Sequence, residues 1–219
     1  MPTRVLVVYH SVHGHVEALA RAVVAGAESV RATDVRIRQV PTSGCVDRGR
    51  GVAEDATADD LRWADGIAWG TPTRYGTMAT PVKQFLDGLV ELWKRGELED
   101  KPTGVFTSSA TIHGGQESTI LTTHVPLLHF GMIVIGTPYV QNPQIFTADA
   151  VGGSPYGPST LAGPNDERAV PAADLCTARN LGIRLARVAS ALKIVRVTTC
   201  QGVEVDTRAY DGEPAIQGV

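Results

Sequence analysis

The sequence has few cysteines, no long apolar run and no cluster of basic residues. Its three cysteines, Cys45, Cys176 and Cys200, show no CxxC spacing, which argues against a disulfide framework and against a zinc site. The first apolar run, Val5 to Tyr9, is too short for a signal-peptide core or a membrane span. We therefore expect a cytoplasmic protein without an integral membrane segment.

The charge and composition also exclude several classes of protein. The formal net charge is -3 and no run of Lys or Arg interrupts the chain, so nucleic acid is a poor partner. With 219 residues, of which 43% are hydrophobic and 20% charged, the chain can bury one substantial core. A single domain with long excursions is the expected organisation.

Strand-like and helix-like segments alternate along the chain. The run Val5 to Tyr9 is continuous and β-branched, as in a strand buried on both faces, whereas Val35 and Ile37 alternate with arginines as at a sheet edge. Such alternation predicts an α/β fold, a doubly wound sheet of five parallel strands in the order 2-1-3-4-5 with helices on both faces. The expected strands lie near 5–9, 35–37, 66–69, 103–107 and 132–135, and the expected helices near 15–29, 59–64, 80–93, 118–129 and 175–192.

Two segments depart from this regular pattern. The fold is expected to occupy residues 1–193, with an excursion at 139–170 that is dense in Gly, Pro, Asn and Ser and too long for a plain connection. It is predicted to be a functional or subunit-contact segment. Residues 194–219 form a C-terminal extension, in which 194–198 could be an added strand or the whole stretch a mobile tail.

Two residues inside predicted helices carry their own expectations. Pro126 lacks the amide hydrogen that the helix needs, so it should kink or shorten the helix at 118–129. Gly182 costs the last helix roughly 1 kcal/mol of propensity against alanine, which suggests that it marks a close packing contact.

The loop after the first strand has the composition of a phosphate site. Residues 10–15 place hydroxyl, small and glycine residues at a helix N-terminus, whose free amides and positive dipole end favour a phosphate, with the Ser11 hydroxyl as a further donor. The loop has neither the lysine of a Walker motif nor the Gly-x-Gly-x-x-Gly of dinucleotide-binding folds. A phosphate monoester suits it best.

Two further loops should face the same crevice, because ligands of doubly wound sheets bind beyond the carboxyl ends of the strands. Residues 70–78 offer backbone amides, an aromatic ring and the Arg74 guanidinium, and residues 107–117 offer small hydroxyl residues and paired glycines. Glycine lets a backbone approach a flat ring closely. Each loop taken alone fits an ordinary turn as well as it fits a ligand-binding loop. The three loops together predict a crevice for a phosphate and a flat ring.

Several short motifs occur in a specific combination within residues 4–192. They are VLVVYHSVHGH at 5–15, GTPTRYG at 70–76, GGQE at 114–117, GM at 131–132, GGSPYG at 152–157 and LAG at 161–163. In this combination the chain resembles the WrbA family of flavodoxin-like NAD(P)H:quinone oxidoreductases.

The resemblance implies a cofactor, substrates and an assembly. It implies FMN bound non-covalently, NADH or NADPH as electron donor, a quinone as acceptor, and homotetramers whose sites draw on neighbouring subunits. It also implies that Trp93 is a wall for quinone or nicotinamide, although the place of Trp93 on a helix stripe favours core packing. The implied cofactor-binding residues are Ser11, Val12, His13, Gly14, His15, Val16, Thr73, Arg74, Tyr75, Ser108, Ser109, Ala110, Thr111, Gly114 and His129.

Departures from the family pattern fall in the first and third loops. His13 stands where many relatives have an aromatic residue that contacts nicotinamide, so His13 joins Trp93 as a candidate nicotinamide contact. Ala110, Ile112 and His113 replace the Gly and Thr of some members, so the third loop could follow a different path. His129, taken alone, also fits a histidine that interacts with a helix dipole.

The expected mechanism is ping-pong turnover, in which hydride passes through flavin N5 and the quinone then takes the place of the nicotinamide. No side chain needs to act as a nucleophile, because the flavin carries the chemistry. One alternative is a one-electron flavodoxin-type carrier, against which the modest net charge of -3 argues. The other is a non-enzymatic partner of a transcription repressor, for which the sequence marks no surface.

A metal site is not expected. His13 and His15 are the closest pair among the six histidines, but no HExxH motif or Cys/His quartet accompanies them.

Overall fold

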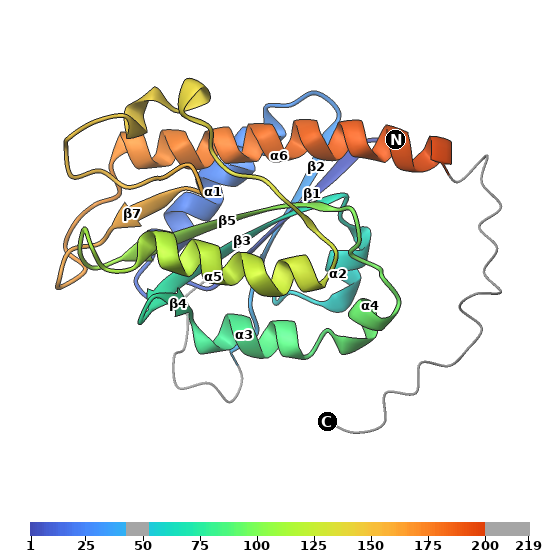
Figure 1. The fold of residues 1–219 in the computed structure, drawn as a ribbon, viewed down its shortest axis with the longest axis horizontal. Helices are drawn as coiled ribbons and strands as arrows, with labels where there is room; N and C mark the ends of the chain where they lie inside the picture. The colour runs from blue at the N-terminus through green and yellow to red at the C-terminus, as the bar shows by residue number, and fades with distance from the viewer. Residues whose placement is uncertain (43–52, 200–219) are drawn as a thin grey trace.

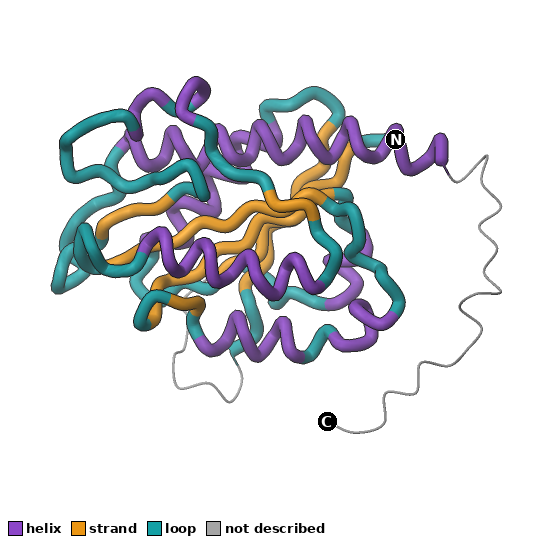
Figure 2. The backbone as a smooth tube through the Cα atoms, in the orientation of Figure 1, coloured by secondary structure: helices purple, strands orange, loops and turns teal. Residues whose placement is uncertain are grey.

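The computed structural model describes residues 1–42 and 53–199, in which one β-sheet lies between two layers of helices (Figures 1 and 2). The strands are β1 (Thr3–Tyr9), β2 (Thr33–Gln39), β3 (Gly66–Arg74), β4 (Thr77–Met78), β5 (Pro102–Ser109), β6 (Ile133–Val134) and β7 (Ser159–Leu161). The α-helices are α1 (His15–Glu28), α2 (Ala58–Trp63), α3 (Thr80–Asp87), α4 (Val90–Lys94), α5 (Gln116–His129) and α6 (Ala172–Thr199), with 3-10 turns η1 (Tyr139–Gln141) and η2 (Pro143–Ile145).

The parallel strands run in the order β2-β1-β3-β5-β6, which confirms the predicted order 2-1-3-4-5. Two short strands enlarge this five-stranded sheet. β4 pairs with the end of β3 in an antiparallel hairpin, and β7 pairs in parallel with β5. β6 pairs with β5 only at Pro102 and Thr103, whereas β7 pairs with residues 107–109. The excursion therefore returns to the sheet and extends it along the second half of β5.

Alternate residues of β1 belong to two separate cores. Val5 and Val7 pack with α1 and α6 on one face, while Leu6 and Val8 pack with residues of α2, α3, α4 and α5 on the other. Figure 1 shows the same division, with α1 and α6 above the sheet and the remaining helices below it. A strand buried on both faces needs an uninterrupted apolar sequence, which is the pattern of residues 5–9.

Two predicted helices differ in the structure. The helix expected at 80–93 is interrupted at Gly88, and in α4 Leu92 is buried while Trp93 is 45% exposed. The core-packing interpretation of Trp93 is therefore wrong. The shortening expected at Pro126 is also not observed, because α5 continues to His129 and the Phe130 amide donates to the Pro126 carbonyl.

The long helix α6 packs along α1, and small residues allow the close approach. A Cβ atom built on Gly182 would overlap the backbone oxygen of Val23, and one on Gly26 would overlap the oxygen of Arg179. The packing role predicted for Gly182 is thus confirmed. α6 continues to Thr199, so the interpretation of 194–198 as a strand is wrong and the predicted boundary at 193 falls inside the helix. Residues 200–219 lie outside the described part of the chain.

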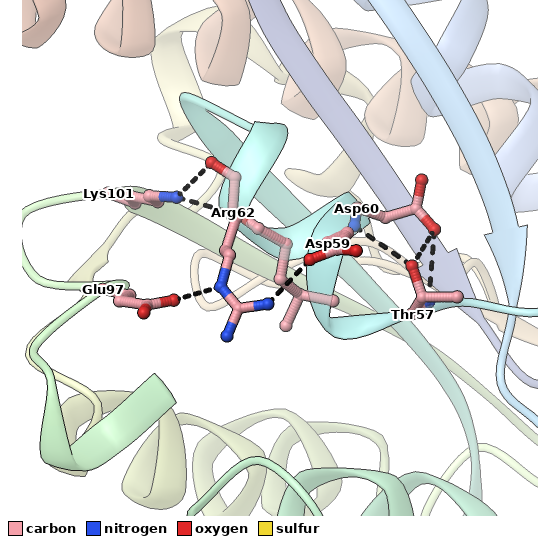
Figure 3. A network of polar contacts seen from close by, with 7 residues as sticks. Thr57, Asp59, Asp60, Arg62, Glu97 and Lys101 are labelled. Atoms are coloured by element: carbon pink, nitrogen blue, oxygen red, sulfur yellow. Dashed lines mark hydrogen bonds and ion pairs between the residues drawn. The ribbon is translucent and has the colours of Figure 1, made fainter. Parts of the chain in front are cut away.

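The buried carboxylate of Asp60 anchors α2 to the sheet (Figure 3). It accepts hydrogen bonds from the Thr57 amide at 3.2 Å and the Thr57 hydroxyl at 2.9 Å, which completes a capping box at the start of α2. Arg36 and Arg38 of β2 lie 3.2 Å and 3.3 Å from the same carboxylate. Burial alone would raise the pKa of Asp60, but the Thr57 hydrogen bonds and the two arginines outweigh it and the pKa is lowered.

The lowered pKa of Asp60 makes a prediction about acid stability. A carboxyl with a lowered folded-state pKa stabilises the fold above its unfolded-state pKa of 3.8 and loses that contribution as the pH falls through the folded-state value. Asp60→Asn should therefore be less stable at neutral pH, and its unfolding free energy should depend less on pH below about 4. Urea denaturation at a series of pH values measures both effects.

Asp59 provides a matched control for this experiment. It lies beside Asp60 on α2, but its side chain is 87% exposed and pairs only at the surface with Arg62 (Figure 3). Exposed ion pairs contribute little, so Asp59→Asn should follow the wild-type pH profile. If the unfolding free energy of Asp60→Asn changed with pH in parallel with that of the wild type, the prediction would be contradicted.

Candidate functional site

A cleft of about 290 Å³ opens at the carboxyl ends of β1, β3 and β5. This is the place that the doubly wound topology predicts for a ligand. The residues that line it are Ser11, Val12, His13, His15, Val16, Pro72, Thr73, Arg74, Ser108, Ser109, Ala110, Thr111, Gly114, Ala162, Pro164 and Asp166. The structure thus brings together twelve of the residues predicted to bind the cofactor.

The first loop presents a helix N-terminus to the cleft. Gly14 caps α1 with a φ of 95°, a left-handed conformation that glycine adopts without strain. The Ser11 hydroxyl oxygen accepts from the amides of Gly14 at 3.1 Å and Glu17 at 3.3 Å. The amides of His15 and Val16 lie in the first turn, where no carbonyl of the helix can accept from them. The arrangement suits an anionic group.

The second loop is the end of β3 and its hairpin to β4. Thr119 of α5 donates its hydroxyl to the Thr73 hydroxyl oxygen at 2.7 Å, and the Gly76 amide donates to the same oxygen at 3.2 Å. Arg74 donates from Nη1 to the Thr73 carbonyl at 2.9 Å. These bonds hold Thr73 and Arg74 at the cleft. Tyr75 has a φ of 55° and a fully exposed side chain, and does not line it.

The third loop folds back on itself before α5. The Ser109 hydroxyl donates to the Thr111 carbonyl at 2.8 Å, and the Gly114 amide donates to the same carbonyl at 3.0 Å. A Cβ atom on Gly114 would lie 2.9 Å from the Thr111 carbonyl oxygen, so the turn has room only for glycine. The loop therefore presents Ser108 to Thr111 to the cleft through a tight backbone path.

The excursion closes the fourth side of the cleft, with Ala162, Pro164 and Asp166 among the lining residues. Asp166 Oδ2 lies 3.4 Å from His13 Nε2, and His15 donates from Nε2 to the Arg168 carbonyl at 2.9 Å. His13 and His15 thus each contact a different residue of the excursion. Among the described residues no three His, Cys, Asp or Glu side chains gather as metal ligands.

The excursion is itself held by the core. The Ala162 amide donates to the Ser109 carbonyl at 2.8 Å as the continuation of β7 pairing, and the Gly152 amide donates to Asp174 Oδ1 at 2.9 Å. Asp174 is fully buried in the first turn of α6, and this burial raises its pKa. Sequence reasoning missed the cleft residues of this segment, although the LAG motif at 161–163 pointed to it.

Two predicted residues lie elsewhere in the chain. Trp93 and His129 share a different surface hollow of about 240 Å³, with Leu86, Asp87, Val90, Pro126 and Phe130. Neither residue lines the cleft of its own chain. Gly14 also does not line the cleft, but it shapes the loop that does. Within the described residues, no helix has both the length and the apolar character needed to cross a membrane.

The sheet order and the loop-built cleft define a flavodoxin-like protein. A structure described as a flavodoxin, WrbA-like protein from Agrobacterium tumefaciens is similar, with a TM-score of 0.63 and 26% identity over 86% of this chain and 98% of that one. An archaeal flavodoxin, at 23% identity, shares the fold with a TM-score of 0.57 over 86% of this chain and 99% of that one.

Comparison with protein families identifies the chain more narrowly. Residues 3–147 match the family described as NADPH-dependent FMN reductase, and the chain belongs to this family. It is 44% identical to a protein of Geotalea uraniireducens named NAD(P)H dehydrogenase (quinone), over 86% of this chain and 98% of that protein. A protein of the same name from Geobacter sulfurreducens is 45% identical over 86% of this chain and 98% of its own length. The resemblance inferred from the sequence motifs is confirmed.

Proposed function

We propose that this protein binds FMN in the cleft and reduces quinones with electrons from NADH or NADPH. In the balanced reaction, a quinone, NAD(P)H and one proton give the hydroquinone and NAD(P)+. The convergence of the three loops in one cleft carries the proposal, because a phosphate site and a wall for a flat ring must lie together. The family membership and the names of the relatives support it.

The donor set of the cleft fits FMN. The amides of His15 and Val16 and the Ser11 hydroxyl suit the phosphate, and the second and third loops suit the ring. Asp166 is the one carboxylate among the described residues of the lining, so the cleft offers little repulsion to a phosphate. When bound, FMN would supply the two-electron redox chemistry.

The chain itself would supply orientation and electrostatic stabilisation. Arg74 and residues of the second and third loops line the cleft, and the guanidinium and backbone amides would stabilise negative charge on a reduced ring there. The hydrogen bonds from Thr119 and Gly76 to Thr73 fix this wall in place before any ligand binds. Such preorganisation lowers the cost of holding donor and acceptor in reactive geometry.

A reconstitution experiment tests the proposed function. Purified protein loaded with FMN should oxidise NADH or NADPH when benzoquinone is present, with initial rates that give parallel lines in double-reciprocal plots, as ping-pong turnover requires. The protein without FMN should show no turnover. If the FMN-loaded protein oxidises neither nicotinamide in the presence of benzoquinone, the proposal is wrong.

We further propose that the active form is a homotetramer in which Trp93 and His129 act at a neighbouring subunit's cleft. Exposed apolar side chains on α4 and α5 support this, because both helices also line the hollow that contains the two residues. These side chains are Val90, Trp93, Leu121, Val125 and Leu128, with exposures between 43% and 58%.

Val125→Lys tests the assembly. A charge buried at a subunit contact is costly, so the variant should sediment as a smaller species and should lose turnover, while its far-UV circular dichroism stays unchanged. Sedimentation velocity measures the change. Ala25→Lys is the matched control, since Ala25 is an exposed residue of α1, which packs on the other face of the sheet from α4 and α5. An unchanged sedimentation coefficient for Val125→Lys would contradict the proposed interface.

A further inference from the structure

We propose that a second hollow beside the cleft binds the adenosine 2′-phosphate end of NADPH, and that Arg168 recognises the phosphate. This inference rests on the proposed function and adds a specificity-determining residue to it. The hollow has a volume of about 430 Å³ and is lined by Ala110, Thr111, Ile112, His113, Ala150, Leu161, Gly163, Pro164 and Arg168.

The hollow adjoins the cleft. Ala110, Thr111 and Pro164 line both, so the third loop and Pro164 form a shared wall between them. A dinucleotide that places one end at the flavin must lay its other end along the adjoining surface. The second hollow is therefore in reach of a ligand that already occupies the cleft.

The lining of the hollow combines apolar walls with positive charge. Ile112 is 54% exposed, and with Ala150 and Leu161 it gives an apolar surface suited to an adenine ring. His113 and Arg168 are the ionisable residues, and among the described lining residues there is no carboxylate. An apolar surface beside a guanidinium fits a flat base with an attached phosphate better than it fits an uncharged quinone.

Backbone contacts hold Arg168 in position. Its amide donates to the Ala162 carbonyl at 2.8 Å, and its Nη2 donates to the Ala150 carbonyl at 2.7 Å. A guanidinium has five N–H donors, so this contact with Ala150 leaves capacity for a phosphate. The Arg168 side chain is therefore held by a hydrogen bond to a neutral backbone carbonyl.

The neighbouring acidic groups have other contacts. Asp166 lies 3.4 Å from His13, and the Glu167 carboxylate accepts from the Asn165 amide at 2.8 Å. Asp174 is fully buried, its pKa is raised by that burial, and Arg168 acts on it in the opposite direction. None of these carboxylates lines the second hollow, so a phosphate there would face Arg168 and His113.

Isothermal titration calorimetry of the FMN-loaded protein with two fragments tests the assignment. The fragments are 2′,5′-ADP, which carries the 2′-phosphate, and 5′-AMP, which does not. The wild type should bind 2′,5′-ADP about tenfold more tightly, the typical effect of one charge-assisted contact. Arg168→Ala should remove this difference, and Arg168→Lys should restore part of it. Ile112→Ala should weaken the binding of both fragments to the same extent.

Controls separate this site from the flavin site. Arg187→Ala removes the same charge from an exposed position on α6 and should leave both affinities unchanged. FMN affinity should be unchanged in Arg168→Ala, and in steady state the KM for NADPH should rise about tenfold while that for NADH stays constant. Equal binding of the two fragments by the wild type, or an undiminished preference in Arg168→Ala, would overturn the inference.

Fragment binding requires no electron transfer, so the two proposals fail in different ways. Selective binding of 2′,5′-ADP without quinone reduction would refute the proposed function and leave the phosphate site intact. Quinone reduction that 2′,5′-ADP does not inhibit would refute the phosphate site alone.

Discussion

Gly182→Ala is expected to lower the free energy of unfolding by roughly 3 kcal/mol, the upper part of the range for overpacked cores. The added methyl group would overlap the Val23 carbonyl oxygen and lie 2.9 Å from the Ala27 amide nitrogen. Both are backbone atoms of α1, so the clash cannot be relieved by a rotamer change and the two helices must separate. Their contact closes the core on one face of the sheet, and α1 begins at the cleft.

Chemical denaturation and thermal melting measure this loss. For a domain of this size, 3 kcal/mol corresponds to a fall in Tm of roughly 6–12 °C. Gly88→Ala is the control, because Gly88 has a φ of -72° and the nearest contact of an added Cβ would be 3.3 Å, to the Phe85 oxygen. It should change stability by no more than about 0.5 kcal/mol. Equal losses for the two variants would contradict a specific role for the α1–α6 contact, since alanine has the higher helix propensity at both positions.

The parallel sheet could be predicted because its strands are marked by local patterns. The run 5–9 is apolar throughout since both of its faces are buried, and the five-strand order followed from helix and strand alternation. β3 was predicted only to Trp69, because Gly70 and Pro72 are typical of turns. In the structure, the Thr71 hydroxyl accepts from the Ala79 amide at 2.9 Å and supports the strand beyond that point.

The rest of the fold depends on contacts between distant segments. β7 has only three residues. It forms a strand because, among the described residues, no other strand pairs with this edge of β5 at residues 107–109. Its short sequence, Ser159–Leu161, carries no pattern that distinguishes it from a loop. The helix expected at 80–93 is likewise interrupted at Gly88, and in α4 Leu92 is buried while Trp93 is exposed. Neither outcome is encoded in local periodicity.

The same distinction applies to the candidate site. The three strand-end loops could be predicted, since topology alone places them at one edge of the sheet. The contact of His13 with Asp166 could not be predicted, because it joins residues more than 150 positions apart and requires the return of the excursion through β7. Thr119, which supports Thr73 from α5, was hidden for the same reason.

Ser11→Ala is expected to weaken FMN binding about 30-fold, which corresponds to roughly 2 kcal/mol for a hydrogen bond to a charged group. The Ser11 oxygen already accepts from the amides of Gly14 and Glu17, so its hydroxyl hydrogen is left to point away from them. Those two amides orient the hydroxyl before a phosphate arrives. Alanine would remove a preoriented donor and would also leave two amides without their acceptor.

Quenching of FMN fluorescence on binding measures the change, and Ser29→Ala is the control at the other end of the same helix. Ser29 donates its hydroxyl to the Gly26 carbonyl at 2.6 Å, so its replacement also removes a helix-terminal hydrogen bond, but one remote from the cleft. Stability should fall by a similar amount, about 1 kcal/mol, in both variants. Only Ser11→Ala should lose FMN affinity, because only that hydroxyl lies in the cleft. Equal FMN affinities in the two variants would place the phosphate elsewhere and remove the basis for assigning the first loop to it.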